Sequence, residues 1–160
     1  MVFAVTHVIL TIVLVDIFRH YLSKHKKKYL FPRWYLIIAG IGGLLPDIDI
    51  VVNWFYSNVI HGDFHLFWVG LVFFALAALF WKKKKHHVDW GLFFLLLGIG
   101  WMFHLFLDCL GGGYKFFLPF SDALFCKEWI PSLYFPHLDA VILLLWLIHE
   151  EWAKKIKDYF

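Results

Sequence analysis

The chain has 160 residues, of which 62% are hydrophobic, 22% aromatic and only 17% charged, and its mean hydropathy is +0.71. This composition excludes an ordinary soluble globular domain. The formal net charge of +3 does not indicate a nucleic-acid partner, because the basic residues lie in short blocks between long apolar runs. Since the sequence has no linker or internal repeat, we expect residues 1–160 to form a single integral membrane domain.

Five apolar runs of 17 to 23 residues follow one another along the chain, at residues 2–22, 34–52, 64–81, 88–110 and 137–153. Each run is long enough to cross a hydrocarbon core of roughly 30 Å as a helix. The first run has no preceding basic region and no small-residue cleavage site after it, so we expect it to remain in the mature protein. The pattern predicts an all-α polytopic membrane bundle with about five transmembrane helices.

Lysine-rich segments indicate the orientation of these helices, because basic residues concentrate in short cytoplasmic loops. Such segments follow the first, third and fifth runs: "SKHKKK" (23–28), "KKKK" (82–85) and "KKIK" (154–157). The loops on the other side, 53–63 and 111–136, contain only Lys115 and Lys127 as basic residues. We therefore predict that the N-terminus lies outside the cell membrane and the C-terminus inside.

Histidine and aspartate residues gather toward the outer side of this topology, at His7, Asp47, Asp49, His61, His65, His104, Asp108, His137 and Asp139. A charged side chain at the centre of a membrane helix costs about 2.5 to 3.5 kcal/mol, so such groups usually share a partner. Neutral imidazole and carboxylate groups suit zinc or another divalent transition ion. We predict that His7, Asp47, His65, His104 and Asp108 hold one or more divalent ions, with zinc as the expected ion.

The stretch "GLLPDIDIVV" (43–52) places two carboxylates inside an apolar run. Pro46 has no N–H group and should kink or end the helix, which would leave Asp47 and Asp49 on irregular backbone. Irregular backbone at membrane depth is tolerated where it lines a polar cavity. We expect Asp47 to bind the metal and Asp49 to act as the general base or as a bridging ligand. The alternative for Asp47 is a helix cap after the kink.

The motifs occur in the order His7, "LLPDID" (44–49), His65, "HLFLD" (104–108) and "GGGYKFFLPFSD" (111–122). This order, which covers roughly residues 5–122, resembles the membrane-bound metal-dependent hydrolase family, the YdjM-like proteins. The resemblance implies a helical integral membrane hydrolase whose metal site is similar in style to that of zinc-dependent phospholipase C. The chain departs from the family at "HGDFHLF" (61–67), where the family commonly has an arginine followed by "THS". An arginine that could hold a phosphate is therefore missing.

Two functions from different classes are open at this point. The first is a metal-dependent hydrolase that acts on a lipid or lipid-linked phosphoester through a metal-activated water, with Asp49 as the catalytic base. The second is a non-catalytic transporter, channel or scaffold whose cluster binds a structural metal or relays protons. A third hypothesis is haem held by paired histidines, which would not need the adjacent carboxylates. The expected partners are membrane lipids, with no nucleic acid.

Some polar residues lie outside the predicted ligand set. His137 and Asp139 lie on the outer side and either support the metal ligands or cap a helix start. Cys109 and Cys126 form no CxxC pair, and two cysteines alone do not fix a redox compartment.

Overall fold

The computed structural model describes residues 4–26, 31–81, 83–85, 88–124 and 126–152. Its helices are α1 (Ala4–Lys26), α2 (Tyr35–Gly42), α3 (Ile48–Phe55), α4 (Phe67–Leu79), α5 (Trp90–Leu110) and α6 (Phe135–Trp152), with short 3-10 helices at Leu45–Asp47 and Ser132–Tyr134. Strands β1 (Lys84–Lys85) and β2 (Val88–Asp89) form a small antiparallel hairpin before α5. The predicted all-α class is confirmed. Of the lysine-rich segments, residues 27, 28, 82 and 154–157 lie outside the described residues.

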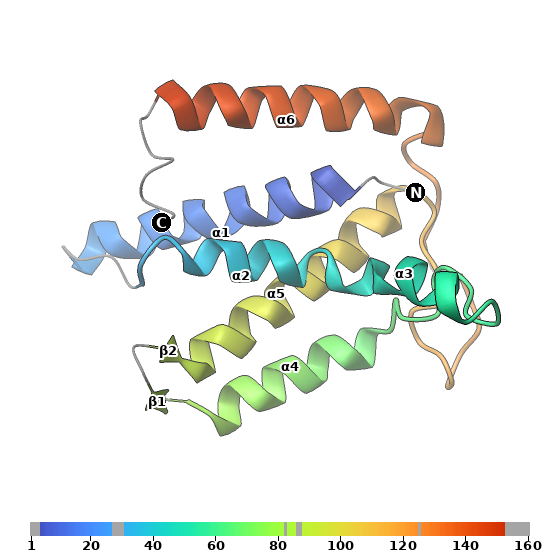
Figure 1. Cartoon of the computed structure of the whole chain (residues 1–160), viewed down its shortest axis with the longest axis horizontal. Helices are drawn as coiled ribbons and strands as arrows, with labels where there is room; N and C mark the ends of the chain where they lie inside the picture. Colours follow the sequence, from blue (N-terminus) through green and yellow to red (C-terminus); the bar gives the residue numbers. More distant parts are fainter. Residues whose placement is uncertain (1–3, 27–30, 82, 86–87, 125, 153–160) are drawn as a thin grey trace.

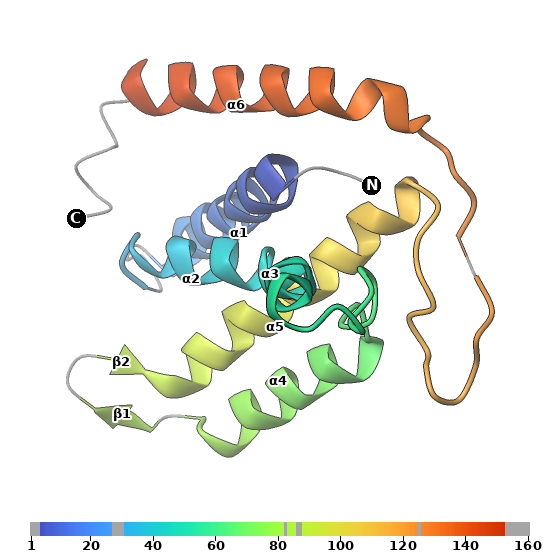
Figure 2. The same cartoon turned by 45° about the vertical axis from the view of Figure 1, so that its right-hand side comes forward.

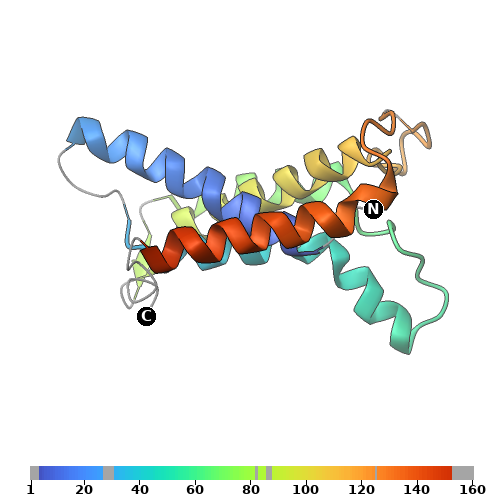
Figure 3. The same cartoon turned by 90° about the horizontal axis from the view of Figure 1, so that it is seen from above.

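The long helices form successive layers (Figure 1). α6 lies along one edge, beside α1. On the other side of α1 lie α2 and α5, and α4 packs against α5. In Figure 2 the same arrangement shows α1 between α6 and the remaining helices. Seen from above in Figure 3, α3 turns away from the direction shared by the other helices. This turn begins where the polar residues of the second run lie.

The core between α1, α2 and α5 depends on close approach of the helices. Buried side chains from these helices meet there, including Ile12, Val15, Leu36, Ala39, Leu96 and Leu97. Gly100 of α5 lies so close to α2 that an added Cβ would collide with the carbonyl oxygen of Ala39. At Gly43, a Cβ would lie 2.8 Å from the carbonyl oxygen of His7. Small residues at these positions therefore bring the end of α2 against both α1 and α5.

The second apolar run is broken at Pro46, as predicted. α2 ends at Gly42, a 3-10 turn contains Pro46, and α3 begins at Ile48. The two helical pieces meet at a bend of 48°. Asp47 occupies the N-cap position of α3, but its side chain makes no capping hydrogen bond. The backbone position fits the cap alternative, while the carboxylate makes its contacts elsewhere.

The number of membrane spans is lower than the predicted five when length and composition are considered. Within the described residues, two helical segments are long and apolar enough to span a membrane, Ala4–Leu22 and Trp90–Leu110, and the bent pair of α2 with Leu45–Phe55 would make a third. α4 has 13 residues, which is about 20 Å of helix and short of a hydrocarbon core. α6 carries Asp139 and two further carboxylates at its end. The apolar runs at 64–81 and 137–153 predicted two further spans, but α4 and α6, which form in these runs, do not meet the length and composition of a membrane span.

Polar pairs attach both ends of α6 to the rest of the fold. At one end, the backbone N–H and the hydroxyl of Thr6 both donate to Oδ1 of Asp139, the former at 3.1 Å. At the other end, the guanidinium of Arg33 donates to both oxygens of Glu150 at 2.8 and 2.9 Å. Asp139 thus connects α6 to the start of α1, at the residue that precedes His7.

Candidate metal centre

The structure brings all of the residues predicted for the site to one end of the bundle, the right-hand end in Figure 1. They come from separate elements: α1, the 3-10 turn, α3, the segment before α4, and α5. The residues are His7, Asp47, Asp49, His65, His104 and Asp108. Their convergence follows from the bend at Pro46 and from the close contact of α2 with α5.

Three donor atoms, which we call the primary centre, form a nearly equilateral triangle. Nε2 of His65 lies 3.0 Å from Nε2 of His104. Oδ2 of Asp108 lies 3.1 Å from Nε2 of His65 and 3.2 Å from Nε2 of His104. Donors that each lie about 2.1 Å from one ion are about 3.0 Å apart at a right angle and about 3.4 Å apart in a tetrahedron. The spacing of the primary centre therefore fits a shared divalent ion.

Asp47 supplies a fourth donor at the edge of the primary centre. Its Oδ1 lies 3.5 Å from Nε2 of His65 and 3.7 Å from Nε2 of His104. These distances are slightly longer than the sides of the triangle. A small rotation of the Asp47 side chain would place the oxygen at the spacing of a tetrahedral site.

The other ring nitrogen of each histidine faces an oxygen acceptor. Nδ1 of His104 lies 2.7 Å from the carbonyl oxygen of Gly43. A carbonyl can only accept, so this Nδ1 carries the proton and the neutral ring presents the lone pair of Nε2 to the centre. Nδ1 of His65 lies 3.3 Å from Oδ2 of Asp49, without the geometry of a hydrogen bond. Oxygen partners of this kind fix the orientation of metal-binding histidines in proteins.

Burial strengthens the case for a cation in the cluster. His65 and His104 are fully buried, and Asp108 is 3% exposed. Two imidazole nitrogens approach Oδ2 of Asp108, yet among the described residues this oxygen has no partner with hydrogen-bond geometry. A buried carboxylate oxygen without a hydrogen bond is unfavourable unless a positive charge, either a bound cation or a protonated imidazole, compensates it. The donor set present therefore fits the predicted metal.

His7 joins the cluster through the second oxygen of Asp108. Its Nε2 lies 3.4 Å from Oδ1 of Asp108, and its ring stacks on that of His104 with the centroids 3.8 Å apart. One donor atom each from His7, Asp47 and His104 lie within 4.8 Å of one another. His7, which the sequence predicted as a metal ligand, thus contacts two residues of the primary centre.

Asp49 is fully buried and both of its oxygens have close partners. Oδ1 lies 2.8 Å from Nδ1 of His61, and Oδ2 accepts the backbone N–H of Gly62 at 2.7 Å. The predicted role of general base stays a prediction. These contacts also suit a carboxylate that orients His61 and His65.

A loop that follows α5 covers the cluster through Tyr114, which the sequence analysis did not single out. The Tyr114 ring lies 4.4 Å from that of His65 and 5.3 Å from that of His61, centroid to centroid. Gly62 adopts a φ of +106°, and a Cβ there would lie 2.6 Å from the Tyr114 ring. Burial and the nearby carboxylates raise the pKa of Tyr114 above its usual value, so the phenol stays neutral. No spacing rule in the sequence identifies this contact.

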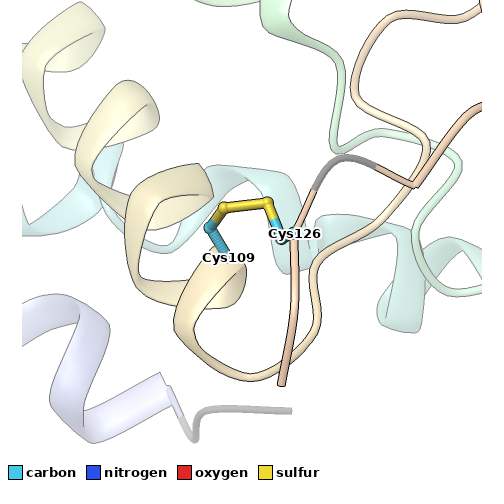
Figure 4. The surroundings of a disulfide bond; sticks show 2 residues. All are labelled: Cys109 and Cys126. Carbon is cyan, nitrogen blue, oxygen red and sulfur yellow. A yellow bond between two sulfur atoms is a disulfide. The ribbon is translucent and has the colours of Figure 1, made fainter. Parts of the chain in front are cut away.

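The same loop is closed by a disulfide between Cys109 and Cys126, shown in Figure 4. Cys109 directly follows Asp108 near the end of α5. The backbone N–H groups of Trp129 and Ile130 donate to the carbonyl oxygen of Leu110 at 2.9 and 3.1 Å. The disulfide and these hydrogen bonds hold the loop against the helix that carries His104 and Asp108.

Metal affinity should depend on pH through His65. Burial lowers the pKa of this side chain, but the carboxylates of Asp108 and Asp47 outweigh burial and raise the pKa from 6.5 to about 9. A metal ion must displace the proton, so the affinity should rise about tenfold per pH unit up to about pH 9 and then level off. Chelator competition between pH 6.5 and 9.5 measures this slope. An affinity that is independent of pH below 8 would contradict metal binding by His65.

Comparison with curated proteins and with solved structures gave no match. A family model described as YdjM inner membrane protein matches residues 1–158, which is nearly the whole chain. The helices long and apolar enough to span a membrane agree with that location. The chain therefore belongs to the YdjM inner membrane protein family.

Proposed function

We propose that this chain is a metal-dependent hydrolase that acts on a lipid or a lipid-linked phosphoester. The observation that carries the proposal is the primary centre, whose three donor atoms lie 3.0, 3.1 and 3.2 Å apart. A divalent ion bound there would activate a water and polarise an ester oxygen. Zinc is the expected ion, because the donors are two imidazoles and carboxylate oxygens.

The exposure of the surrounding side chains supports a lipid-linked substrate. The side chains of Asp47 and His61 are 10% and 24% exposed, whereas those of His65 and His104 are fully buried. A substrate would therefore approach from the side of Asp47 and His61. On α3, which follows Asp47, Trp54 and Phe55 are 76% and 78% exposed. Large apolar side chains beside this approach suit the hydrocarbon part of a membrane lipid.

The complete burial of His65 and His104 favours a second candidate, a structural metal site in a non-catalytic membrane protein. Structural sites surround their ion with protein ligands, whereas catalytic sites keep one position open for water or substrate. Four donors from His65, His104, Asp108 and Asp47 would fill a tetrahedral site. A five-coordinate ion, or exchange of Asp47 for water, would restore the open position.

Hydrolysis by the metal-loaded protein separates the two candidates. We expect detergent-purified protein loaded with zinc or manganese to release product from at least one member of a panel of phospholipids and lipid-linked phosphates. The matched control is the Asp108→Asn variant, which retains the side-chain shape and loses the charge of the primary centre. A wild-type protein that holds its ion and hydrolyses nothing in a broad panel would contradict the hydrolase and favour the structural site.

We further propose that the metal centre faces the extracytoplasmic side, with the N-terminus outside. The Cys109–Cys126 disulfide lies at the same end as the cluster, and disulfides persist in oxidising compartments. β1, which contains Lys84 and Lys85, lies at the opposite end of the bundle. Basic residues favour the cytoplasmic side. The position of the disulfide and the position of the lysines thus both support an extracytoplasmic metal centre.

Cysteine labelling tests this orientation, because both native cysteines are joined in the disulfide and should not react. In spheroplasts, a membrane-impermeant maleimide is expected to label Ser57→Cys, which lies in the exposed turn between α3 and α4. Lys83→Cys is also exposed, at the other end, and should react only after the membrane is opened. The reverse pattern would overturn the orientation and leave the metal centre unaffected.

A further inference from the structure

His61 lies beside the primary centre but outside the predicted ligand set. It occupies the turn between α3 and α4. Its Nδ1 lies 2.8 Å from Oδ1 of Asp49. In the neutral ring, Nδ1 donates its proton to this carboxylate and Nε2 carries the lone pair. Nε2 is buried and has no hydrogen-bond partner among the described residues.

The same pattern marks the two histidines of the primary centre. Nδ1 of His104 lies 2.7 Å from the carbonyl oxygen of Gly43, as a hydrogen bond. Nδ1 of His65 lies 3.3 Å from Oδ2 of Asp49, without the geometry of a hydrogen bond. In each of these rings, Nε2 is the nitrogen at the centre. His61 therefore has the arrangement of a metal-binding histidine, with a carboxylate on one nitrogen and the other nitrogen available.

Donors for an ion at His61 are close. A ring nitrogen of His61, a carboxylate oxygen of Asp47 and a ring nitrogen of His65 lie within 4.8 Å of one another. Nε2 of His65 already belongs to the primary centre, so the residue best able to serve two ions is Asp47. Its carboxylate has two oxygens, and paired ions in proteins lie about 3.5 to 4 Å apart.

Contacts on several sides fix the position of His61. Its ring lies edge-on to that of His65 and to that of Tyr114, at centroid distances of 5.1 and 5.3 Å. The next residue, Gly62, donates its backbone N–H to Oδ2 of Asp49 at 2.7 Å. Asp49 therefore holds both the side chain of His61 and the backbone that follows it. A donor held this way loses little freedom when it binds an ion.

We propose that His61 binds a second divalent transition ion, which shares the carboxylate of Asp47 with the ion of the primary centre. The proposal rests on the proposed function only in requiring that the primary centre hold a metal. It assigns Asp49 as a positioning residue that orients His61. The side chain of His61 is 24% exposed, so an ion bound to it would lie on the side from which a substrate would approach.

Metal stoichiometry in two variants tests the proposal. His61→Asn keeps an amide N–H near the place of Nδ1, so it can still donate to Asp49, but it has no atom in place of Nε2. His20→Asn is the matched control, because His20 is a half-exposed histidine on α1 away from the cluster. Purified proteins are titrated with Mn²⁺ and with Zn²⁺, and bound ions are counted by mass spectrometry. The spin coupling of Mn²⁺ is read by electron paramagnetic resonance.

We expect two ions per chain in the wild type and in His20→Asn, with a spin-coupled Mn²⁺ pair, and one uncoupled ion in His61→Asn. If His61→Asn does not fold, His61→Arg provides a second variant, since arginine also donates to Asp49 and cannot bind a metal. One ion in the wild type, or two in a folded His61 variant, would overturn the second site and leave the proposed function intact. A wild type without any ion would instead overturn the primary centre.

Discussion

Replacing His104 with alanine is expected to abolish stoichiometric metal binding. Nε2 of His104 is one of the three donor atoms of the primary centre and lies 3.0 and 3.2 Å from the other two. Its Nδ1 donates to the carbonyl oxygen of Gly43. The variant would retain one histidine and one aspartate of the triangle. Because loss of a supporting residue alone weakens metal binding by about 10- to 100-fold, loss of a direct ligand should exceed roughly 100-fold. Chelator competition and elemental analysis of the purified variant measure the effect.

The control for this experiment is His137→Ala, which removes an exposed histidine near the start of α6. It should bind metal as the wild type does. Since His104 is fully buried, circular dichroism and size-exclusion chromatography must show that the His104→Ala variant remains folded. A folded His104→Ala protein with wild-type affinity would show that the primary centre is not the metal site.

Replacing Asp49 with asparagine should weaken metal binding by about 10- to 100-fold, as expected for a carboxylate that orients metal-binding histidines. Its oxygens lie 2.8 Å from Nδ1 of His61 and 3.3 Å from Nδ1 of His65. An amide keeps the shape of the side chain and removes the negative charge that both rings face. The effect should appear in the affinity for metal before any substrate is added.

The role of general base, which the sequence predicted for Asp49, leads to a different expected result for Asp49→Asn. A general base should leave metal affinity nearly unchanged in Asp49→Asn and lower turnover roughly 10²- to 10⁴-fold. The contacts of Asp49 favour the positioning role. Asp63→Asn is the matched control, because Asp63 is an exposed carboxylate in the same turn and should leave the affinity unchanged. Unchanged affinity in Asp49→Asn would refute the positioning role.

Much of the fold follows from simple patterns in the sequence. Apolar runs predict helices because the backbone must satisfy its own hydrogen bonds in lipid. Pro46 breaks the second run because it has no N–H and clashes with the preceding turn. The common depth of His7, Asp47, His65 and His104 could be predicted from run boundaries and the lysine rule. Their distances could not, because these depend on helix contacts such as that at Gly100.

Other features could not be predicted for physical reasons. Run length overestimates spans where the helix is shorter than its apolar run, as in α4, which covers Phe67–Leu79 of the run at residues 64–81. His61 and His65 have helical spacing in the sequence, yet both precede α4 and lie outside any helix. Their ring nitrogens lie 2.8 and 3.3 Å from the carboxylate of Asp49. Tyr114 reaches the cluster through a loop closed by a disulfide. Long-range loop contacts of this kind leave no periodic signal.

Elemental analysis of the wild-type protein, purified in detergent without chelators, tests the metal centre most directly. The primary centre predicts at least one tightly bound transition ion per chain, with zinc as the expected element. Dialysis against a strong chelator should remove the ion, and added zinc should restore it. Protein that contains no ion after purification, and that takes up none when zinc is added at neutral pH, would show that the cluster is a polar network rather than a metal site.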